Sequence, residues 1–83
     1  MIPCVEEARH TRDYRVWVKF DDGTEGEINL EKELWGEVFE PLRDVNFFRQ
    51  LRVDPELHTI VWPNGADFSP EFLYSECCSV KTT

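Results

Sequence analysis

The stretch from Thr59 to Tyr74, TIVWPNGADFSPEFLY, constrains the fold most, because signals for a strand, a turn and a helix follow one another within it. Residues 59–62 are β-branched or aromatic, which favours a short strand. Pro63 has no amide to donate to a strand ladder, and Asn64-Gly65 offers the positive φ that a tight turn requires. We therefore expect a strand that ends at a tight turn.

A helix start follows at Ser69-Pro70-Glu71. Ser69 can accept a hydrogen bond from a free backbone amide, Pro70 suits the first helical position, and Glu71 faces the positive end of the helix dipole. We predict that Asp67 accepts backbone amides of the preceding turn or of this helix. The residues expected to hold this structural junction are Trp62, Asn64, Gly65, Asp67 and Ser69.

Alternating apolar residues at 14–20 indicate a half-buried strand that enters a hairpin through the following Asp-Asp-Gly turn. A two-residue loop would place Phe20 opposite Glu25, whereas a three-residue loop, with Gly23 in the left-handed region, places Phe20 opposite Thr24. The longer loop fits better, because it pairs apolar residues on one face and charges on the other. It sets Lys19 opposite Glu25, Trp17 opposite Glu27 and Val16 opposite Ile28.

Short helices are predicted after this hairpin. Residues 29–36 indicate a helical segment with Asn29 as its cap and Gly36 as its stop, and Pro41 prevents one long helix through the region. Asp44 can cap a second helix. Val38, Phe39 and Leu42 form another apolar turn, and Phe47, Phe48 and Leu51 of the second helix are expected to pack inward.

A second hairpin is predicted around Asp54-Pro55-Glu56, which is a type I turn signal. We expect His58 to close this turn, since His tolerates the left-handed region. The expected pairing sets Val53 opposite Thr59 and Leu51 opposite Val61.

The whole pattern predicts an α+β fold with two antiparallel β-hairpins, short helices between them and a C-terminal helix. The length of 83 residues fits one domain. We expect a single compact domain over residues 1–78 and a polar tail over residues 79–83. A first strand is also expected within residues 2–10, but apolar and charged residues do not alternate there, which leaves its inward face open.

Charge and hydropathy limit the partners and the location. The net charge of −8 argues against nucleic acid, whose binding needs clustered Lys and Arg. No run approaches the about 18 apolar residues of a membrane span. The N-terminal residues MIPCVEE lack the basic and apolar character of a signal sequence. We therefore expect a cytoplasmic protein without a nucleic-acid or membrane partner.

Three cysteines, Cys4, Cys77 and Cys78, form a poor disulfide framework because their number is odd and two are adjacent. Together with His10 or His58 they could supply metal ligands, but no C-x-x-C or H-x-x-x-H spacing is present. We expect free thiols, no bound metal and no cofactor.

Three segments together resemble a small bacterial family of unknown function, numbered 2442. These are VWVKFDDGT at 16–24, VFEPLRD at 38–44 and VWPNGAD at 61–67, and the resemblance extends from about Val5 to Tyr74. It implies a compact α+β domain without a catalytic residue. In some members this domain is joined to a helix-turn-helix segment, and in others it is encoded beside a second small protein in a toxin–antitoxin-like pair. The chain departs from the family pattern at His58, where many members carry Gly, and at Cys77-Cys78.

Two classes of function follow. Enzymatic candidates are Asp54, His58, Asp67 and Glu71, and none lies in a recognisable catalytic motif. A small hydrolase or metal-dependent enzyme with a site around Asp67 and His58 is the alternative function. Charge, size and the missing motifs favour a non-catalytic protein-interaction module. One form of it is a regulatory or neutralising partner whose acidic surface meets a small basic protein.

The outward face of the first hairpin is the candidate interface. Trp17 is expected there between Arg15 and Lys19 and opposite Glu27, and an exposed Trp is usually covered. The first strand offers little apolar surface to cover the indole. We therefore predict that this face contacts another chain, in a homodimer or with a different partner.

Overall fold

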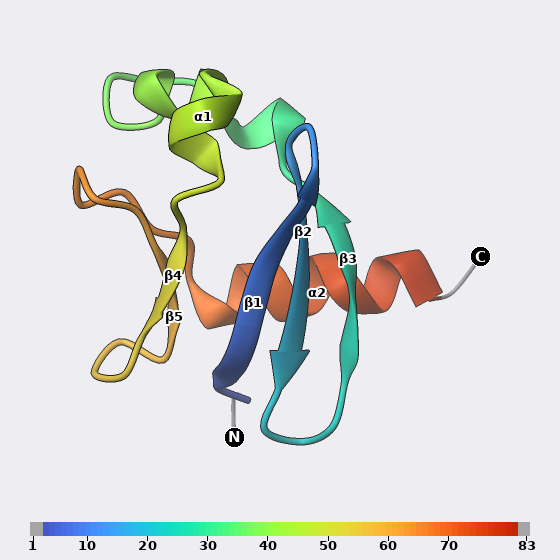
Figure 1. Ribbon diagram of the computed structural model, residues 1–83. Helices are drawn as coiled ribbons and strands as arrows, with labels where there is room; N and C mark the ends of the chain where they lie inside the picture. Colours follow the sequence, from blue (N-terminus) through green and yellow to red (C-terminus); the bar gives the residue numbers. More distant parts are fainter. Residues whose placement is uncertain (1–2, 82–83) are drawn as a thin grey trace.

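The computed structural model describes the backbone of residues 3–81 and the side chains of residues 3–77, and it has the predicted α+β fold (Figure 1). The first sheet contains β1 (Val5–Arg12), β2 (Arg15–Phe20) and β3 (Glu25–Asn29). The second sheet is the hairpin of β4 (Arg52–Asp54) and β5 (Thr59–Val61). The helical pieces are the 3₁₀ turns η1 (Glu31–Glu33) and η2 (Glu40–Arg43), the short helix α1 (Val45–Phe48) and the C-terminal helix α2 (Pro70–Lys81).

The hairpin of β2 and β3 has the predicted register, which pairs Lys19 with Glu25, Trp17 with Glu27 and Val16 with Ile28. Gly23 has a φ of +91°, and the amide of Phe20 donates to the carbonyl of Thr24 at 2.8 Å. These two features confirm the three-residue turn. The inward side chains of β2 are buried, so the hairpin forms one wall of the core.

The strand β1 pairs antiparallel with β2 and gives the sheet the order β1-β2-β3. Its register shifts twice, between Val5 and Glu7 and between His10 and Arg12. Such irregularities change which residues face inward. Val5 is buried, and Ala8, three residues later, also packs against the core, whereas strict alternation would give an even spacing. This odd spacing explains why the inward face of the strand could not be predicted from the sequence.

Less of the segment at 29–36 is helical than predicted, because only residues 31–33 form a 3₁₀ turn. The side-chain Oδ1 of Asn29 accepts the amide of Glu31 at 3.0 Å, although the residue at the cap position is Leu30. Gly36, with a φ of +93°, redirects the chain after the loop.

Asp44 caps α1 as predicted, since its Oδ1 accepts the amide of Asn46 at 2.9 Å. Phe48 at the end of this helix is fully buried, while Phe47 and Leu51 pack against the core and stay partly exposed.

The second hairpin forms, but its predicted register is wrong by one residue. The structure pairs Arg52 with Val61, Val53 with Ile60 and Asp54 with Thr59. Asp54 belongs to the ladder and also organises the turn: its carboxylate accepts the amides of Glu56 and Leu57, and its carbonyl accepts the amide of His58 at 2.8 Å. The loop is therefore residues 55–58, and His58 closes it at a φ of +58°.

Helix α2 begins where the sequence predicted. The Oγ of Ser69 accepts the amide of Phe72 at 3.1 Å, directly before Pro70. The helix continues to Lys81, so residues 79–81 are helical although the sequence assigned them to a polar tail, and residues 82–83 lie outside the described range. Within residues 3–81 no helix is long and apolar enough to cross a membrane.

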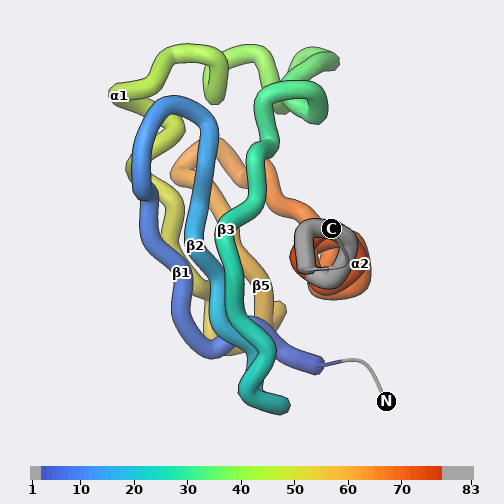
Figure 2. Tube along the Cα trace, turned by 90° about the vertical axis from the view of Figure 1, so that its right-hand side faces the viewer, coloured from blue at the N-terminus to red at the C-terminus, as the bar shows by residue number. Residues whose placement is uncertain are grey.

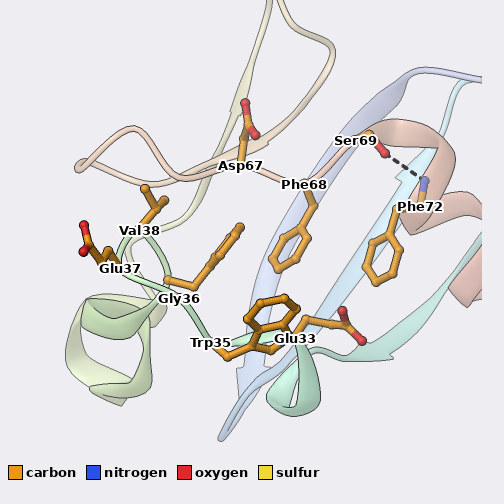
Figure 3. A pocket seen from close by; sticks show the side chains of 10 residues that line it. Glu33, Trp35, Gly36, Glu37, Val38, Asp67, Phe68, Ser69 and Phe72 are labelled. Atoms are coloured by element: carbon orange, nitrogen blue, oxygen red, sulfur yellow. Dashed lines mark hydrogen bonds between the residues drawn. The ribbon is translucent and has the colours of Figure 1, made fainter.

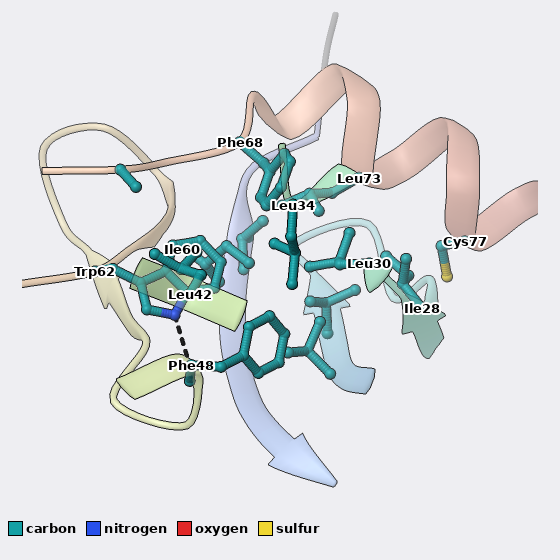
Figure 4. Packing of buried hydrophobic residues seen from close by; sticks show 14 of the residues in the cluster. Ile28, Leu30, Leu34, Leu42, Phe48, Ile60, Trp62, Phe68, Leu73 and Cys77 are labelled. Atoms are coloured by element: carbon teal, nitrogen blue, oxygen red, sulfur yellow. Dashed lines mark hydrogen bonds between the residues drawn. The ribbon is translucent and has the colours of Figure 1, made fainter. Parts of the chain in front are cut away.

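The core lies between the three-stranded sheet and α2, which crosses one face of that sheet (Figures 1 and 2). The indole Nε1 of Trp62 donates to the carbonyl of Phe48 at 2.7 Å inside this core, which ties the turn after β5 to α1 (Figure 4). Among the described side chains of α2, those of residues 70–77, Leu73 and Cys77 are fully buried. Other fully buried residues are Val16, Val18, Phe20, Leu30, Leu42 and Ile60.

Candidate functional site

A groove of about 530 Å³ lies between the loop that follows η1 and the start of α2 (Figure 3). Its size falls in the range of roughly 300–1,000 Å³ that is typical of ligand sites. Two segments that are distant in sequence, residues 33–39 and 67–72, supply its lining. The fold therefore creates a concave surface that neither segment would form alone.

Three phenylalanine rings form the floor of the groove. Phe39 stacks on Phe68 with ring centroids 4.9 Å apart, and Phe68 stacks on Phe72 at 5.5 Å. The ring of Trp62 packs edge-on against Phe68 at 5.7 Å. The row is thus anchored to the core in its middle, while Phe39 and Phe72 at its two ends remain half-buried.

Trp35 and Val38 form the exposed apolar wall. Trp35 is 72% exposed and Val38 is 52% exposed, although side chains of this kind are normally more buried. In Figure 3 the rings of Phe68 and Phe72 point from the start of α2 toward the indole of Trp35. Exposed apolar surface beside a groove is typical of a binding site.

The rim of the groove is acidic. Glu33, Glu37 and Asp67 belong to its lining, and the described lining residues include no Lys or Arg. In Figure 3 the carboxylate of Asp67 points away from the aromatic rings, so it contributes charge at the edge rather than a ligand at the floor. The groove combines an apolar floor with a negative rim.

Asn64 connects the turn after β5 to the wall of the groove. Its Nδ2 donates to the carbonyl of Val38 at 2.9 Å, and its Oδ1 accepts the amide of Ala66 at 3.1 Å. The amide of Trp62 donates to the carbonyl of Ala66 at 2.9 Å and closes the turn, in which Gly65 has a φ of +90°. Asn64 therefore positions the loop that carries Val38 relative to the turn.

The hydrogen bonds predicted for Asp67 are formed by its neighbours instead. The amide of Ala66 goes to Asn64 and the amide of Phe72 goes to Ser69, as described above. Within the described range the carboxylate of Asp67 accepts no hydrogen bond, and its backbone forms an isolated bridge with Val61. The structural junction thus contains Asp67 through its backbone only.

The two residues of the alternative enzyme site occupy different parts of the fold. His58 lies in the turn between β4 and β5, where its carbonyl accepts the amide of Val5 at 3.0 Å. Asp67 lies at the rim of the groove. No hydrogen bond joins their side chains among the described residues, so the structure does not bring them together as an acid–base pair.

The cysteines and His10 also occupy separate environments. Cys4 is half-buried, Cys77 is buried against the sheet, neither belongs to a disulfide, and the side chain of Cys78 lies outside the described range. The Nε2 of His10 lies 2.8 Å from the carbonyl oxygen of Asp13. Among the described residues no group of three His, Cys, Asp or Glu side chains is arranged to hold a metal ion.

The predicted interface residues share the outer face of the three-stranded sheet. The Nη1 of Arg15 lies 3.4 Å from the Oε1 of Glu27, and Lys19 pairs across the strands with Glu25. The guanidinium of Arg9 lies 4.5 Å from the centre of the Trp17 ring. Trp17 is therefore half-buried, and the first strand covers it with the cation of Arg9 rather than with an apolar side chain.

The comparison with family models gives a match over residues 5–79 to the family described as protein of unknown function (DUF2442). The chain belongs to this family. The match confirms the resemblance predicted from the sequence. No curated protein matches the chain, and no solved structure does. In this DUF2442 chain, two of the segments that carried the resemblance, 38–44 and 61–67, meet through the hydrogen bond from Asn64 to Val38.

Trp35 is the functional candidate that the sequence analysis missed. It was included in a helical segment, where an aromatic residue is expected to pack inward. The available signal was its position directly before the stop glycine Gly36, with Glu33 and Glu37 on either side. A Trp at the end of a short helical turn has no further turn of helix to pack it onto the core.

Proposed function

We propose that this DUF2442 chain is a non-catalytic protein-interaction domain that binds a basic partner protein. The observation that supports this most is the exposed groove, in which Trp35 stands beside a row of stacked rings. Trp and other aromatic residues are enriched in the central contacts of protein interfaces. A hydrolytic site would require carboxylates that converge on one point, whereas those of Glu33, Glu37 and Asp67 lie apart along the rim of the groove (Figure 3).

The charge of the chain supports a basic partner. A net charge of −8 on 83 residues attracts a cationic protein over distance and raises the rate of encounter. A regulatory or neutralising role toward a small basic protein, within a toxin–antitoxin-like pair in the cytoplasm, is the specific form of this function that we propose.

The alternative, a hydrolase with a site around Asp67 and His58, has less support. A general base needs a partner group that orients it and a substrate within reach. His58 lies in a turn away from the groove lining, and the carboxylate of Asp67 accepts no hydrogen bond among the described residues. Neither residue shows the surroundings of an acid or a base in catalysis.

Purification of the tagged chain from cells of its native organism at low salt tests the proposal. We expect one basic protein in a fixed ratio to the chain, released by an excess of untagged chain and by added salt, because screening weakens charge pairing. Elemental analysis and mass spectrometry of the same sample provide the contrary outcome. A stoichiometric metal ion or small molecule with no protein partner would show that the domain is not primarily an interaction module.

A further inference from the structure

The floor of the groove sets the first requirement for whatever segment binds there. The stacked rings of Phe39, Phe68 and Phe72 offer aromatic surface that is half-buried at both ends of the row. Burial of such surface favours an apolar side chain over a charged one. An occupant of this groove must therefore carry at least one aliphatic or aromatic side chain.

The rim sets the second requirement. Glu33, Glu37 and Asp67 place three carboxylates around the groove, and its described lining carries no cation to balance them. A second copy of this acidic chain would bring further carboxylates toward the same rim. Charge complementarity instead selects a segment with Lys or Arg.

The chain itself shows how a cation covers a tryptophan. On the outer face of the sheet the guanidinium of Arg9 lies over Trp17, which is half-buried. Among the described residues no Arg or Lys lies over the ring of Trp35, and this side chain is 72% exposed. A cation from outside would find at Trp35 an open ring face together with carboxylates, which is a favourable setting for a cation–π contact.

We infer that the groove binds a basic segment of the partner protein, with an Arg or Lys side chain over Trp35 beside the carboxylate rim and an adjacent apolar side chain on the row of Phe39, Phe68 and Phe72. This inference rests on the proposed function and assigns it a site. Asn64 is a positioning residue for this site, because its hydrogen bond to the Val38 carbonyl holds the wall of the groove.

Selection of a phage-displayed library of random peptides on the immobilised full chain at low salt provides the probe. We expect enriched peptides that place Arg or Lys next to a large apolar residue. Synthetic versions of them should lose at least about tenfold in affinity for Trp35→Ala, as is typical of central interface residues. They should also bind Glu33→Gln/Glu37→Gln more weakly and with a smaller dependence on salt, because two charges of the rim are removed.

Matched variants outside the groove are the controls. Leu57→Ala removes an exposed apolar side chain from the turn between β4 and β5, and Glu6→Gln/Glu7→Gln removes two carboxylates from the exposed part of β1. Both should bind the peptides as the wild type does. Amide shifts in two-dimensional NMR spectra should concentrate in residues 33–39 and 67–72 on peptide addition.

Several outcomes would overturn the inference. These are a failure to enrich any peptide, enrichment of acidic peptides, equal binding to Trp35→Ala, and self-association of the chain that Trp35→Ala abolishes. A native partner that co-purifies equally well with the wild type and with Trp35→Ala would overturn the groove as its site while leaving the proposed function in place.

Discussion

Gly23 is the residue on which the turn of the first hairpin depends. Its φ is +91°, and apart from Gly23 and its two chain neighbours no described heavy atom lies within 4 Å of the position that a Cβ would take. Replacement by Ala therefore tests backbone strain without a steric clash, and Gly23→Ala should lower the free energy of unfolding by on the order of 1 kcal/mol. Urea denaturation measures this change. An unchanged midpoint would contradict the three-residue turn.

Asn64 makes two separable hydrogen bonds, and two substitutions distinguish them. Asn64→Asp keeps an oxygen for the amide of Ala66 but loses the donor to the carbonyl of Val38, whereas Asn64→Ala loses both. We expect each lost hydrogen bond to cost about 0.5–1.5 kcal/mol, so Asp should destabilise less than Ala. If chemical denaturation shows that both substitutions lower the free energy of unfolding equally, the hydrogen bond from the amide of Ala66 to Asn64 contributes nothing to stability.

The sequence could predict the side chains whose hydrogen-bond partners lie within a few residues along the chain. Asp44 and Ser69 cap their helices as expected, because the amides they accept lie two or three residues farther along the chain. Asp67 did not follow its prediction. The amide of Ala66 in the turn is bonded to Asn64 and the amide of Phe72 in the helix is bonded to Ser69, and that competition depends on the folded turn rather than on residue type.

At the scale of elements, the contact between β3 and α2 depends on Gly26. A Cβ at this position would lie 2.9 Å from the Sγ of Cys77, and Cys77 is fully buried. Gly26→Ala should therefore destabilise the protein by roughly 1–3 kcal/mol through overpacking.

The double variant Gly26→Ala/Cys77→Ala checks this contact. Removal of the sulfur makes room for the new methyl group, so the double variant should be more stable than the sum of the two single losses predicts. If the changes in the free energy of unfolding of the two single variants add up to that of the double variant, in thermal or urea unfolding, residues 26 and 77 do not clash.

The two hairpins differ in how far their sequences specify their registers. In β2 buried and half-buried residues alternate along the whole strand, so a shift by one residue would reverse both faces. In β5 all of Thr59, Ile60 and Val61 are buried, and alternation gives no information. The register there is set by the hydrogen bonds of Asp54 in the turn, which explains the error of one residue in the predicted pairing.

At the scale of the whole molecule, the groove could not be predicted because its walls come from segments that meet only after folding. The rings of Phe39, Phe68 and Phe72 were readable as apolar, but their stacking depends on the packing of the loop against the start of α2. The exposure of Trp35 is likewise a property of the assembled surface.

Two aspartates link the stability of the fold to pH. The pKa of Asp54 lies below its ordinary value of 3.8, first because the amides of Leu57 and Glu56 donate to its carboxylate. The pKa of Asp22 is lowered chiefly by the amide of Thr24, and the hydroxyl of Tyr74 also donates to it at 2.9 Å. A carboxylate whose pKa is lower in the folded than in the unfolded state stabilises the fold at pH values above its unfolded pKa. This contribution is lost as the pH falls through the pKa of the folded state.

We therefore expect the unfolding temperature to fall as the pH decreases below about 4, where these carboxylates become protonated. Asp54→Asn and Asp22→Asn should each reduce this dependence on pH, because the replaced group no longer titrates. Thermal unfolding followed by circular dichroism across the acidic range measures it. A wild-type unfolding temperature that stays constant between neutral pH and about pH 3 would contradict the assignment.

The homodimer predicted from the outer sheet face concerns the assembly of whole chains. Arg15, Lys19 and Glu27 place both signs of charge around the half-buried Trp17, so two copies related by a two-fold axis could set cation against carboxylate. Light scattering at micromolar concentration should give the mass of a dimer for the wild type and for Trp35→Ala, and that of a monomer for Trp17→Ala. A monomeric wild type would contradict the homodimer. It would mean that Arg9 alone covers the ring of Trp17 well enough for the chain to remain a monomer. A dimer that persists in Trp17→Ala would place the contact on another face, and a dimer lost only in Trp35→Ala would assign the groove to a second copy.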